Sequence, residues 1–374
     1  MRRTILTVLG TRPEAIKLFP LLHALAADPR CESRLCVTGQ HGAMVDAVLA
    51  QAGIVPDRAC GPVPPGLSVD ALTALMLVRV GAALDAERPD WVVLQGDTAT
   101  ALAGALAAHG RQIPIAHVEA GLRSGDPRQP WPEEWNRKAI AALATLHCAP
   151  TRRAADALLA EAVAPGAIHV TGNTVVDALR WTTARLAREP ALGGRMAALE
   201  RRFAGLHIVA VTAHRRENWG KGVDGIATAI EALAARGDLG LIVPLHPNPA
   251  VRGPLQRRLA GLASVALVEP LDYPDFTRLL SVARLILTDS GGVQEEAPAL
   301  GTPVLVLRDT TERPEGLVAG TARLVGTDPA RIVAEAARLL DDPAAHRAMA
   351  RAHNPYGDGQ AAARIAALLL DVAL

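Results

Sequence analysis

Short apolar runs alternate with longer amphipathic stretches from one end of the chain to the other. The runs are rich in β-branched and other apolar residues, as in TILTVLG at 4–10, WVVLQGD at 91–97 and LILTDSGG at 285–292, and the stretches between them are rich in Ala and Leu. A strand pattern followed by a helical pattern, repeated many times, is typical of βαβ units. The pattern therefore predicts an α/β fold built on parallel sheets.

The predicted strands form two sets, one in each half of the chain. The first set consists of the runs at 4–10, 33–40, 91–97, 113–121, 145–151 and 167–173. The second set consists of the runs at 207–214, 239–247, 265–270, 285–292 and 303–309.

The stretch between the two sets, residues 178–206, is rich in charged and small residues and carries no strand pattern. We interpret it as helix and connector joining two α/β domains, which suits a chain of 374 residues. The final stretch, 360–374, is helical after the turn-rich HNPYGDG at 353–359, and we expect it to pack back on the first domain. The predicted domains are therefore 1–172 plus 360–374, and 173–359.

The charge balance argues against a polyanionic or membrane partner. The chain has 39 Lys+Arg against 38 Asp+Glu, a formal charge of +1, so we expect neither nucleic acid nor a membrane as a partner. The first apolar run is too short for a signal peptide, and no run reaches the roughly 20 apolar residues that span a bilayer. Cys31, Cys36, Cys60 and Cys148 include no C-x-x-C pair, so we expect buried thiols in a reducing cytoplasm.

Acidic residues follow several predicted strands in the first half. Asp97 ends one run, Glu119 ends another, and Glu133 and Glu134 follow in QPWPEEWNR. Asp97 alone is well explained as the cap of the helix after it. Three acids beside one crevice are harder to explain by capping, because clustered carboxylates repel one another and raise a pKa toward values useful in acid–base catalysis. We therefore expect a catalytic role for Asp97, for Glu119 and for one of the pair Glu133 and Glu134.

Residues suited to phosphate follow strands in both halves. Ser290, Gly291 and Gly292 lie between a strand and a helix, so their N–H groups can face an anion without hindrance from Cβ atoms. Ser-Gly-Gly is also a common tight turn, and alone it favours neither interpretation. Glu296, in the same helix, is suited to accept hydrogen bonds from a ribose. Further candidates for phosphate are Arg12, Lys17, His214 and Arg313.

Simpler explanations compete for some of these residues. Arg12 and Lys17 alone are better explained as solvated charges on a capped helix, and a lone histidine after a strand is usually a satisfied polar residue. Neither His214 nor His246 has a second ligand at metal-binding spacing, so we expect no metal. No G-x-G-x-x-G follows the first strand, so we expect no nicotinamide cofactor.

Several longer motifs resemble one enzyme family. In order along the chain they are GTRPEAIKLFPL, GDTATALAGALAA, HVEAGLRSGD, PWPEEWNR, GNTVVDAL, HRREN, DSGGVQEEAPALGTPVLVLRDTTERPE and HNPYGDGQA. Each motif is moderately specific, whereas the ordered set, which spans nearly the full length, is highly specific. On these motifs the chain resembles the bacterial non-hydrolysing UDP-N-acetylglucosamine 2-epimerases.

The resemblance implies a fold and a reaction. The expected fold has two Rossmann-like domains facing across a cleft, the GT-B type, with parallel sheets and the last helix on the first domain. The expected reaction is the reversible conversion of UDP-N-acetylglucosamine to UDP-N-acetylmannosamine, by elimination of UDP to give 2-acetamidoglucal and re-addition of UDP. A UDP-sugar is then the expected partner, no cofactor is implied, and the family suggests a homodimer.

The resemblance also implies roles for particular residues. Asp97, Glu119 and Glu133 match the catalytic acids, with Glu134 as a possible substitute for Glu133, and His214 helps to stabilise the departing diphosphate. The residues expected to bind substrate are Arg12, Lys17, Leu271, Phe276, Ser290, Gly291, Gly292, Glu296 and Arg313. Among these, Glu296 would hold the ribose, Phe276 would lie beside the uridine, and the backbone near Leu271 would contact the uracil edge.

One part of the family pattern is altered. In many bacterial members, residues after the Gln-His of the second strand and a later polar loop bind a second, activating UDP-sugar. Here Gln40 and His41 are followed by Gly-Ala, and the later loop, RACGPVPPGLS, has Pro64 and Pro65 where polar contacts are expected. Gln40, His41, Arg215 and His246 remain as possible allosteric residues, and we expect weakened or absent activation by the substrate.

Other functions fit parts of the sequence. The same scaffold can epimerise a modified sugar, such as a UDP-2,3-diacetamido uronic acid. A GT-B glycosyltransferase would share the nucleotide site at Ser290 to Glu296, but Asp97 and Glu119 argue against it. A hydrolysing epimerase is less consistent with the full motif set, and a protein that only binds nucleotides has no need for the acid cluster. Identification of the product separates these alternatives.

Overall fold

The computed structural model describes residues 2–372. By their internal contacts these residues divide into two compact units. Unit 1 extends to Ala178 and resumes at Tyr356, and unit 2 extends from Leu179 to Pro355.

Unit 1 is built on a parallel sheet. Within the described residues its seven strands lie in the order β3-β2-β1-β4-β5-β6-β7, and every neighbouring pair is parallel. The order reverses between β1 and β4, so the sheet is doubly wound with its switch point there. The strands are β1 (Arg3–Leu9), β2 (Cys31–Val37), β3 (Arg58–Ala59), β4 (Trp91–Gln95), β5 (Ile115–Val118), β6 (Leu146–Ala149) and β7 (Ile168–Val170).

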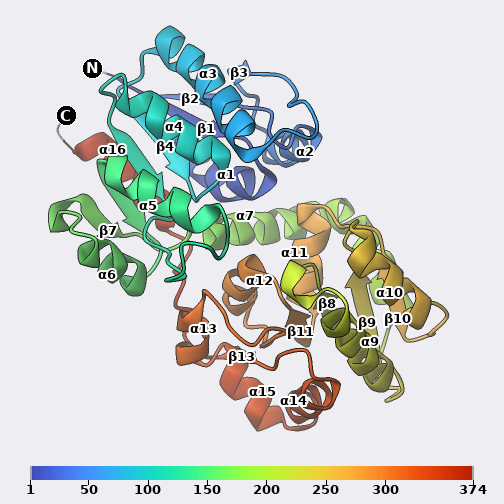
Figure 1. The fold of residues 1–374 in the computed structure, drawn as a ribbon. Helices are drawn as coiled ribbons and strands as arrows, with labels where there is room; N and C mark the ends of the chain where they lie inside the picture. The colour runs from blue at the N-terminus through green and yellow to red at the C-terminus, as the bar shows by residue number, and fades with distance from the viewer. Residues whose placement is uncertain (1, 373–374) are drawn as a thin grey trace. The chain divides into compact units, whose positions relative to one another are not determined.

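Helices connect these strands (Figure 1). Several begin at a hydroxyl cap: the side chains of Thr11, Ser68, Thr98 and Thr151 each accept from a backbone N–H of the first turn, a contact that stabilises a helix by about 1 kcal/mol. α7 (Thr174–Arg188) begins in unit 1 and ends in unit 2. The others are α1 (Arg12–Ala27), α2 (Ala43–Ala52), α3 (Val69–Glu87), α4 (Ala99–His109), α5 (Glu133–Leu143), α6 (Arg152–Ala160) and α16 (Ala361–Asp371).

The last helix packs in unit 1 although it is the most distant from β1 in the sequence. α16 contacts α1, and Arg3 donates from Nη1 to the carbonyl of Leu369 over 2.7 Å. The carboxylate of Asp177, in α7, accepts from the N–H groups of Ala361 and Ala362 at 3.3 and 2.9 Å. Because these N–H groups begin α16, Asp177 caps the returning helix.

Unit 2 repeats the same construction. In the part of the chain that the structure describes, its six strands lie in the order β10-β9-β8-β11-β12-β13, all parallel, with the switch point between β8 and β11. The strands are β8 (His207–Thr212), β9 (Leu239–Pro244), β10 (Val265–Val268), β11 (Leu285–Thr288), β12 (Val304–Val306) and β13 (Ala322–Leu324). The helices are α8 (Gly194–Arg202), α9 (Lys221–Ala234), α10 (Pro249–Leu259), α11 (Tyr273–Val282), α12 (Gly291–Glu296), α13 (Pro314–Ala319), α14 (Pro329–Asp341) and α15 (Pro343–Ala350).

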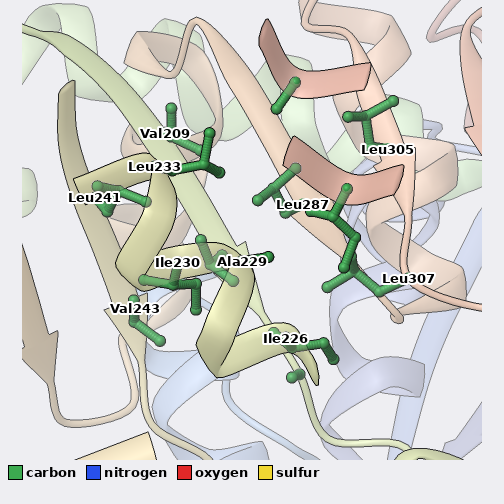
Figure 2. Packing of buried hydrophobic residues seen from close by; sticks show 14 of the residues in the cluster. Val209, Ile226, Ala229, Ile230, Leu233, Leu241, Val243, Leu287, Leu305 and Leu307 are labelled. Atoms are coloured by element: carbon green, nitrogen blue, oxygen red, sulfur yellow. The ribbon is translucent and has the colours of Figure 1, made fainter. Parts of the chain in front are cut away.

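Both faces of the unit 2 sheet are buried. Figure 2 shows Ile230 and Leu233 of α9 packed with Val209 of β8 in one apolar cluster. The alternate residues of β8, Ile208 and Ala210, belong to a second cluster. Because successive side chains of a strand point to opposite faces, a strand covered on both faces must be apolar throughout. This accounts for the continuous apolar runs in the sequence.

The predicted α/β class with parallel sheets is confirmed. Each of the runs predicted as a strand contains a strand, and the stretch 178–206 holds the end of α7 and all of α8. The sequence pattern does not predict β3 and β13, because strands of two and three residues are too short to show a period. Between residues 2 and 372, no helix combines the length and apolar composition needed to cross a bilayer.

Candidate active site

The candidate residues of unit 1 lie at the switch point of its sheet. In a doubly wound sheet, ligands bind beyond the carboxyl ends of the strands where the strand order reverses. β1 is followed by Arg12 and Lys17 in α1, and β4 is followed by Asp97. β5, the neighbour of β4, is followed by Glu119. The fold therefore brings these groups to one edge of the sheet.

Asp97 does not cap the helix that follows it. The cap of α4 is Thr98, whose hydroxyl accepts from the N–H of Ala101 over 3.0 Å. The carboxylate of Asp97 accepts instead from Nη1 of Arg137 over 2.9 Å, and its backbone carbonyl accepts from Nδ2 of Asn136 over 2.7 Å. Two residues of α5 thus hold Asp97, and the explanation of this acid as a helix cap is wrong.

The surroundings of Asp97 favour its protonated form. Burial raises the pKa of Asp97 above the ordinary aspartate value, although 29% of the side chain remains exposed. The guanidinium of Arg137 and the ammonium of Lys17 lower this pKa, whereas the carboxylates of Glu119 and Glu133 raise it. Like charges in one site disfavour each other's ionised forms. Glu119 and Glu133 therefore lie near enough to Asp97 to influence its ionisation.

Glu119 is tightly constrained. Its φ is +62°, in the left-handed region that residues other than glycine seldom adopt, and its side chain is buried. Lys17 donates from Nζ to both carboxylate oxygens at 2.6 Å, and the side-chain amides of Gln95 and Asn173 also donate to this carboxylate. Unusual backbone at a buried acid is typical of a functional site. Lys17, which the sequence predicts beside phosphate, thus lies beside an acid.

Glu133 and Glu134 begin α5, but their surroundings differ. Glu134 is fully buried, and its carboxylate accepts from the N–H groups of Ser124 and Gly125 and from Nε of Arg137 at 3.1, 3.3 and 3.1 Å. These bonds tie the preceding loop to α5. In the described part of the chain, Oε2 of Glu133 is buried without a hydrogen-bond partner. The carboxylate of Glu134 therefore serves to hold the structure together, whereas Glu133 keeps one carboxylate oxygen that can still accept a hydrogen bond.

The start of α1 already carries a carboxylate. Oε2 of Glu14 accepts from the N–H groups of Gly10 and Thr11 at 2.9 and 2.7 Å, and its Oε1 accepts from the hydroxyl of Thr98 over 2.6 Å. A helix start attracts an anion, and here a capping box supplies that anion from within the helix. Arg12 and Pro13 are both exposed at the same helix start, so Arg12 presents its charge to solvent there.

In unit 2 the candidate residues also follow the strands at the switch point. β8 leads to His214 and Arg215, and β11 leads to Asp289 and Ser290. Asp289 is fully buried, and its carboxylate accepts from the N–H groups of His214 and Arg215 and from Nδ2 of Asn218, each at 3.0 Å. One carboxylate therefore fixes the loop after β8 to the end of β11.

The turn at Ser290, Gly291 and Gly292 lies against charged side chains. Gly291 is the first residue of α12. A Cβ atom added to it would lie 3.1 Å from Oε1 of Glu312 and 3.4 Å from Nη2 of Arg215. A side chain at Gly291 would therefore press on the tips of two charged side chains, whereas an added Cβ atom at Gly292 would meet nothing within 4 Å.

Glu312 is the centre of that cluster. It accepts from Arg215 over 3.0 Å and from Arg308 over 2.6 Å, and Arg313 donates from Nε to Glu295. Although burial opposes ionisation, the guanidinium groups of Arg313, Arg215 and Arg308 lower the pKa of Glu312 to about 2. Fixed guanidinium groups beside a glycine turn are suited to an anion of high charge.

The expected nucleoside-binding residues lie around α11 and α12. Glu296 ends α12, and its Oε1 accepts from the hydroxyl of Tyr273 in α11 over 3.1 Å. Phe276, also in α11, is half-buried against the second apolar cluster of unit 2, the one that contains Ile208 and Ala210. Leu271 is buried just before α11. The contact through Tyr273 joins the segment that carries Leu271 and Phe276 to Glu296.

Two of the possible allosteric residues are in unit 1. Oε1 of Gln40 accepts from the hydroxyl of Thr100 over 2.8 Å, and the N–H of His41 donates to the carbonyl of Gly10 over 2.7 Å. Burial and the charge of Arg12 lower the pKa of His41. These contacts place the loop after β2 beside the start of α1.

The other two, Arg215 and His246, are in unit 2. The ring of His246 stacks on that of His214 with centroids 5.8 Å apart, and Nδ1 of His246 accepts from the N–H of Asn248 over 3.2 Å. Among residues 2–372, no group of three His, Cys, Asp or Glu side chains is arranged to hold a metal ion.

The structure adds residues to the site that the sequence pattern does not reveal. Arg137 holds Asp97, Asn173 holds Glu119, and Asp289 holds the loop after β8. All three lie in motifs quoted above, PWPEEWNR, GNTVVDAL and DSGGVQEE. The motifs mark their importance, but a motif does not show which distant side chain a residue contacts.

Comparison with known proteins identifies the family. A family model described as UDP-N-acetylglucosamine 2-epimerase matches residues 23–370. The chain is 50% identical over 370 residues to the probable UDP-N-acetylglucosamine 2-epimerase of Ralstonia solanacearum, with 97% of both chains covered. It is 49% identical over 363 residues to the UDP-N-acetylglucosamine 2-epimerase of Escherichia coli K12, with 96% of both covered.

A solved structure agrees with these sequence matches. The crystal structure of UDP-GlcNAc 2-epimerase from Neisseria meningitidis bound to UDP-GlcNAc matches with a TM-score of 0.92 at 40% identity, covering 99% of this chain and 100% of that one. The resemblance drawn from the motifs, and the expected similarity to the GT-B type of fold, are thereby confirmed. The chain belongs to the UDP-N-acetylglucosamine 2-epimerase family, a family of isomerases.

Proposed function

We propose that this protein catalyses the reversible epimerisation of UDP-N-acetylglucosamine at C2 to give UDP-N-acetylmannosamine. The reaction is supported by the family to which the chain belongs and by its relatives from Escherichia coli and Neisseria meningitidis, which are named as UDP-N-acetylglucosamine 2-epimerases. The observation that carries the proposal is the acid cluster at the switch point of one sheet, together with a glycine turn beside fixed arginines at the switch point of the other. Carboxylates serve proton transfer, and guanidinium groups suit a diphosphate.

In this proposal unit 2 binds the UDP part of the substrate. The backbone of Gly291 and Gly292 can approach a phosphate closely because glycine lacks a Cβ atom. Arg215 and Arg313 lie beside this turn, and their charges would stabilise a diphosphate. Glu296, oriented by the hydroxyl of Tyr273, would accept from a ribose hydroxyl.

Further residues complete the proposed substrate site. The uracil would lie near the backbone of Leu271 and beside Phe276, and Ser290 would add its N–H to the phosphate contacts. Arg12, exposed at the start of α1, and His214 would stabilise the charge that develops on UDP as it departs.

The chemistry of C2 explains why acids and a diphosphate site occur together. C2 has no neighbouring carbonyl, so its proton is too weakly acidic for simple removal and return. In an elimination, a carboxylate takes the C2 proton as the C1–O bond to UDP breaks, which leaves 2-acetamidoglucal and UDP. UDP then adds back at C1, and C2 receives a proton on the opposite face. Inversion therefore requires acid–base groups on both faces.

We assign the two proton transfers to Asp97 and Glu133. Burial raises the pKa of Asp97, which suits a group that must hold and deliver a proton. Glu133 has a buried carboxylate oxygen with no partner in the described chain, which suits a base. Glu119 is engaged by Lys17 and two amides, so we assign it to hold the Lys17 ammonium beside Asp97.

The product formed from UDP-N-acetylglucosamine in D₂O tests this function. We expect UDP-N-acetylmannosamine with deuterium at C2, detected in the C1 and C2 proton signals by NMR, without accumulation of free sugar. Release of free N-acetylmannosamine would indicate a hydrolysing enzyme instead. An unchanged sugar, with UDP still bound, would contradict the proposed substrate and favour a modified UDP-sugar or a transfer reaction.

We propose that the protein forms a homodimer through α3. Exposed residues of α3 include Ala74, Leu77, Val78 and Ala82, which recur at the spacing of one helix face. Leu77 and Val78 are 38% and 71% exposed, and Leu106 of the neighbouring α4 is 42% exposed. An apolar stripe on the surface is typical of an interface between protein chains.

Val78→Glu is expected to convert the dimer to a monomer, because the interface would have to bury an unpaired charge. Size-exclusion chromatography with light scattering measures the mass. Val55→Glu is the matched control, since Val55 is 84% exposed outside α3 and should leave the mass unchanged. A monomeric wild type, or a dimeric Val78→Glu variant, would show that α3 is not the interface.

A cytoplasmic location and a role in polysaccharide biosynthesis complete the proposal. In the described chain Cys31, Cys36, Cys60 and Cys148 are free thiols, the form expected in a reducing compartment. The proposed product is an amino sugar activated by UDP, and activated sugars are the donors from which polysaccharides are built.

A further inference from the structure

Asn173 lies where two distant segments of unit 1 meet. The chain leaves unit 1 after Ala178 and returns to it at Tyr356, and the N–H of Asn173 donates to the carbonyl of Tyr356 over 2.7 Å. A Cβ atom added to Gly172 would lie only 3.4 Å from the Cα atom of Gly357. The outgoing and returning segments therefore touch backbone to backbone beside Asn173.

The side chain of Asn173 joins this junction to the acid cluster. Its Oδ1 accepts from the N–H of Val175 over 3.1 Å, and its Nδ2 donates to Oε1 of Glu119 over 3.3 Å. Because a backbone N–H needs an oxygen as its acceptor, the amide nitrogen must face Glu119. Asn173 is 2% exposed, so water cannot readily replace either contact.

We propose that Asn173 is a positioning residue for the reaction: its amide holds the carboxylate of Glu119 and ties this acid to the segments that connect the two units. This inference rests on the proposed function, in which Glu119 holds Lys17 beside Asp97. Glu119 needs such support because its left-handed backbone is unfavourable by itself. Charged and titratable groups that interact with Glu119 in the described chain include Lys17 of α1, Asp97 after β4 and His117 of β5.

Asn173→Asp tests this role, because it keeps the shape and the acceptor for Val175 but turns an oxygen toward Glu119. Two carboxylates so close repel each other, and one of them takes up a proton as the pH falls. At pH 8 we expect turnover about tenfold below the wild type. At pH 6 a shared proton restores both the hydrogen bond and the original charge, so the ratio of variant to wild-type turnover should rise.

Two further variants separate positioning from a general loss of structure. Asn173→Ala removes the donor without adding charge, so its lower turnover should not recover as the pH falls. Asp177→Asn lies in the same segment and caps α16 without contact to Glu119. It should lower the melting temperature and leave the turnover ratio independent of pH. A ratio for Asn173→Asp that does not change between pH 8 and pH 6 would overturn the proposal.

Thermal melting tests the contact without any reaction. The added carboxyl has a raised pKa in the folded state, so the loss of stability in Asn173→Asp should be larger at pH 8 than at pH 6. Adding Glu119→Gln should restore stability, because the new amide can donate to the new carboxylate. An equal loss of stability at both pH values would overturn the contact. A wild type without epimerase activity would instead reject the proposed function, and the positioning role with it, whatever the melting shows.

Discussion

Asp97→Asn is expected to lower turnover by about 10² to 10⁴-fold, the usual contribution of general acid–base catalysis. Asparagine fills the same space but can neither hold nor deliver a proton. UDP affinity should change by less than about twofold, because the residue acts in the chemical step and the groups proposed to bind UDP are mainly in unit 2. Turnover by NMR and UDP affinity by calorimetry measure the two effects separately.

Asp85→Asn is the matched control for this prediction. Asp85 is also in unit 1, but its side chain is 65% exposed and pairs with Arg111 at the surface. The same change of charge there should leave both turnover and binding unchanged. If Asp97→Asn lost binding and turnover equally, Asp97 would belong to the nucleotide site. Unchanged turnover would remove it from proton transfer.

Strands buried on both faces are the elements that the sequence predicts best. All residues of β4 and β11 are buried, and each strand is an unbroken apolar run up to its last residue, Gln95 or Thr288. β3 consists of two exposed residues, and its place in the sheet depends on pairing with β2 rather than on its own composition. Pairing between distant segments leaves no local pattern, which is why such short edge strands are not predicted.

The residues at the strand ends could be predicted in the same way, but their partners could not. Asp97 and Glu119 follow apolar runs, so the βαβ pattern alone places them at one edge of the sheet. The partner of Glu119 is Lys17, 102 residues away, and no local pattern indicates this pair. The sequence predicts Lys17 near phosphate because a helix start attracts anions, yet the carboxylate of Glu14 already occupies that helix start.

Asp289→Asn is expected to weaken UDP binding about 10- to 100-fold. Turnover should fall by no larger a factor than the affinity for UDP does. Hydrogen bonds to charged groups contribute about 1.5 to 3 kcal/mol, and 1.4 kcal/mol corresponds to a factor of about ten in affinity. The buried carboxylate of Asp289 accepts from His214, Arg215 and Asn218, whereas an asparagine offers one oxygen and turns an NH₂ group toward donors. The loop after β8 would then lose its attachment to β11. Calorimetry with UDP measures the affinity.

Asp238→Asn serves as the control within unit 2, because its side chain is 46% exposed and pairs with Arg236 at the surface. It should bind UDP as the wild type does. UDP affinity in Asp289→Asn equal to that of the wild type would mean that the loop after β8 does not contribute to the nucleotide site. A variant that binds normally but turns over slowly would place the loop with the acids. Asp97→Asn is thus expected to lower mainly turnover, and Asp289→Asn to weaken mainly UDP binding. Together the two variants test the assignment of proton transfer to unit 1 and of nucleotide binding to unit 2.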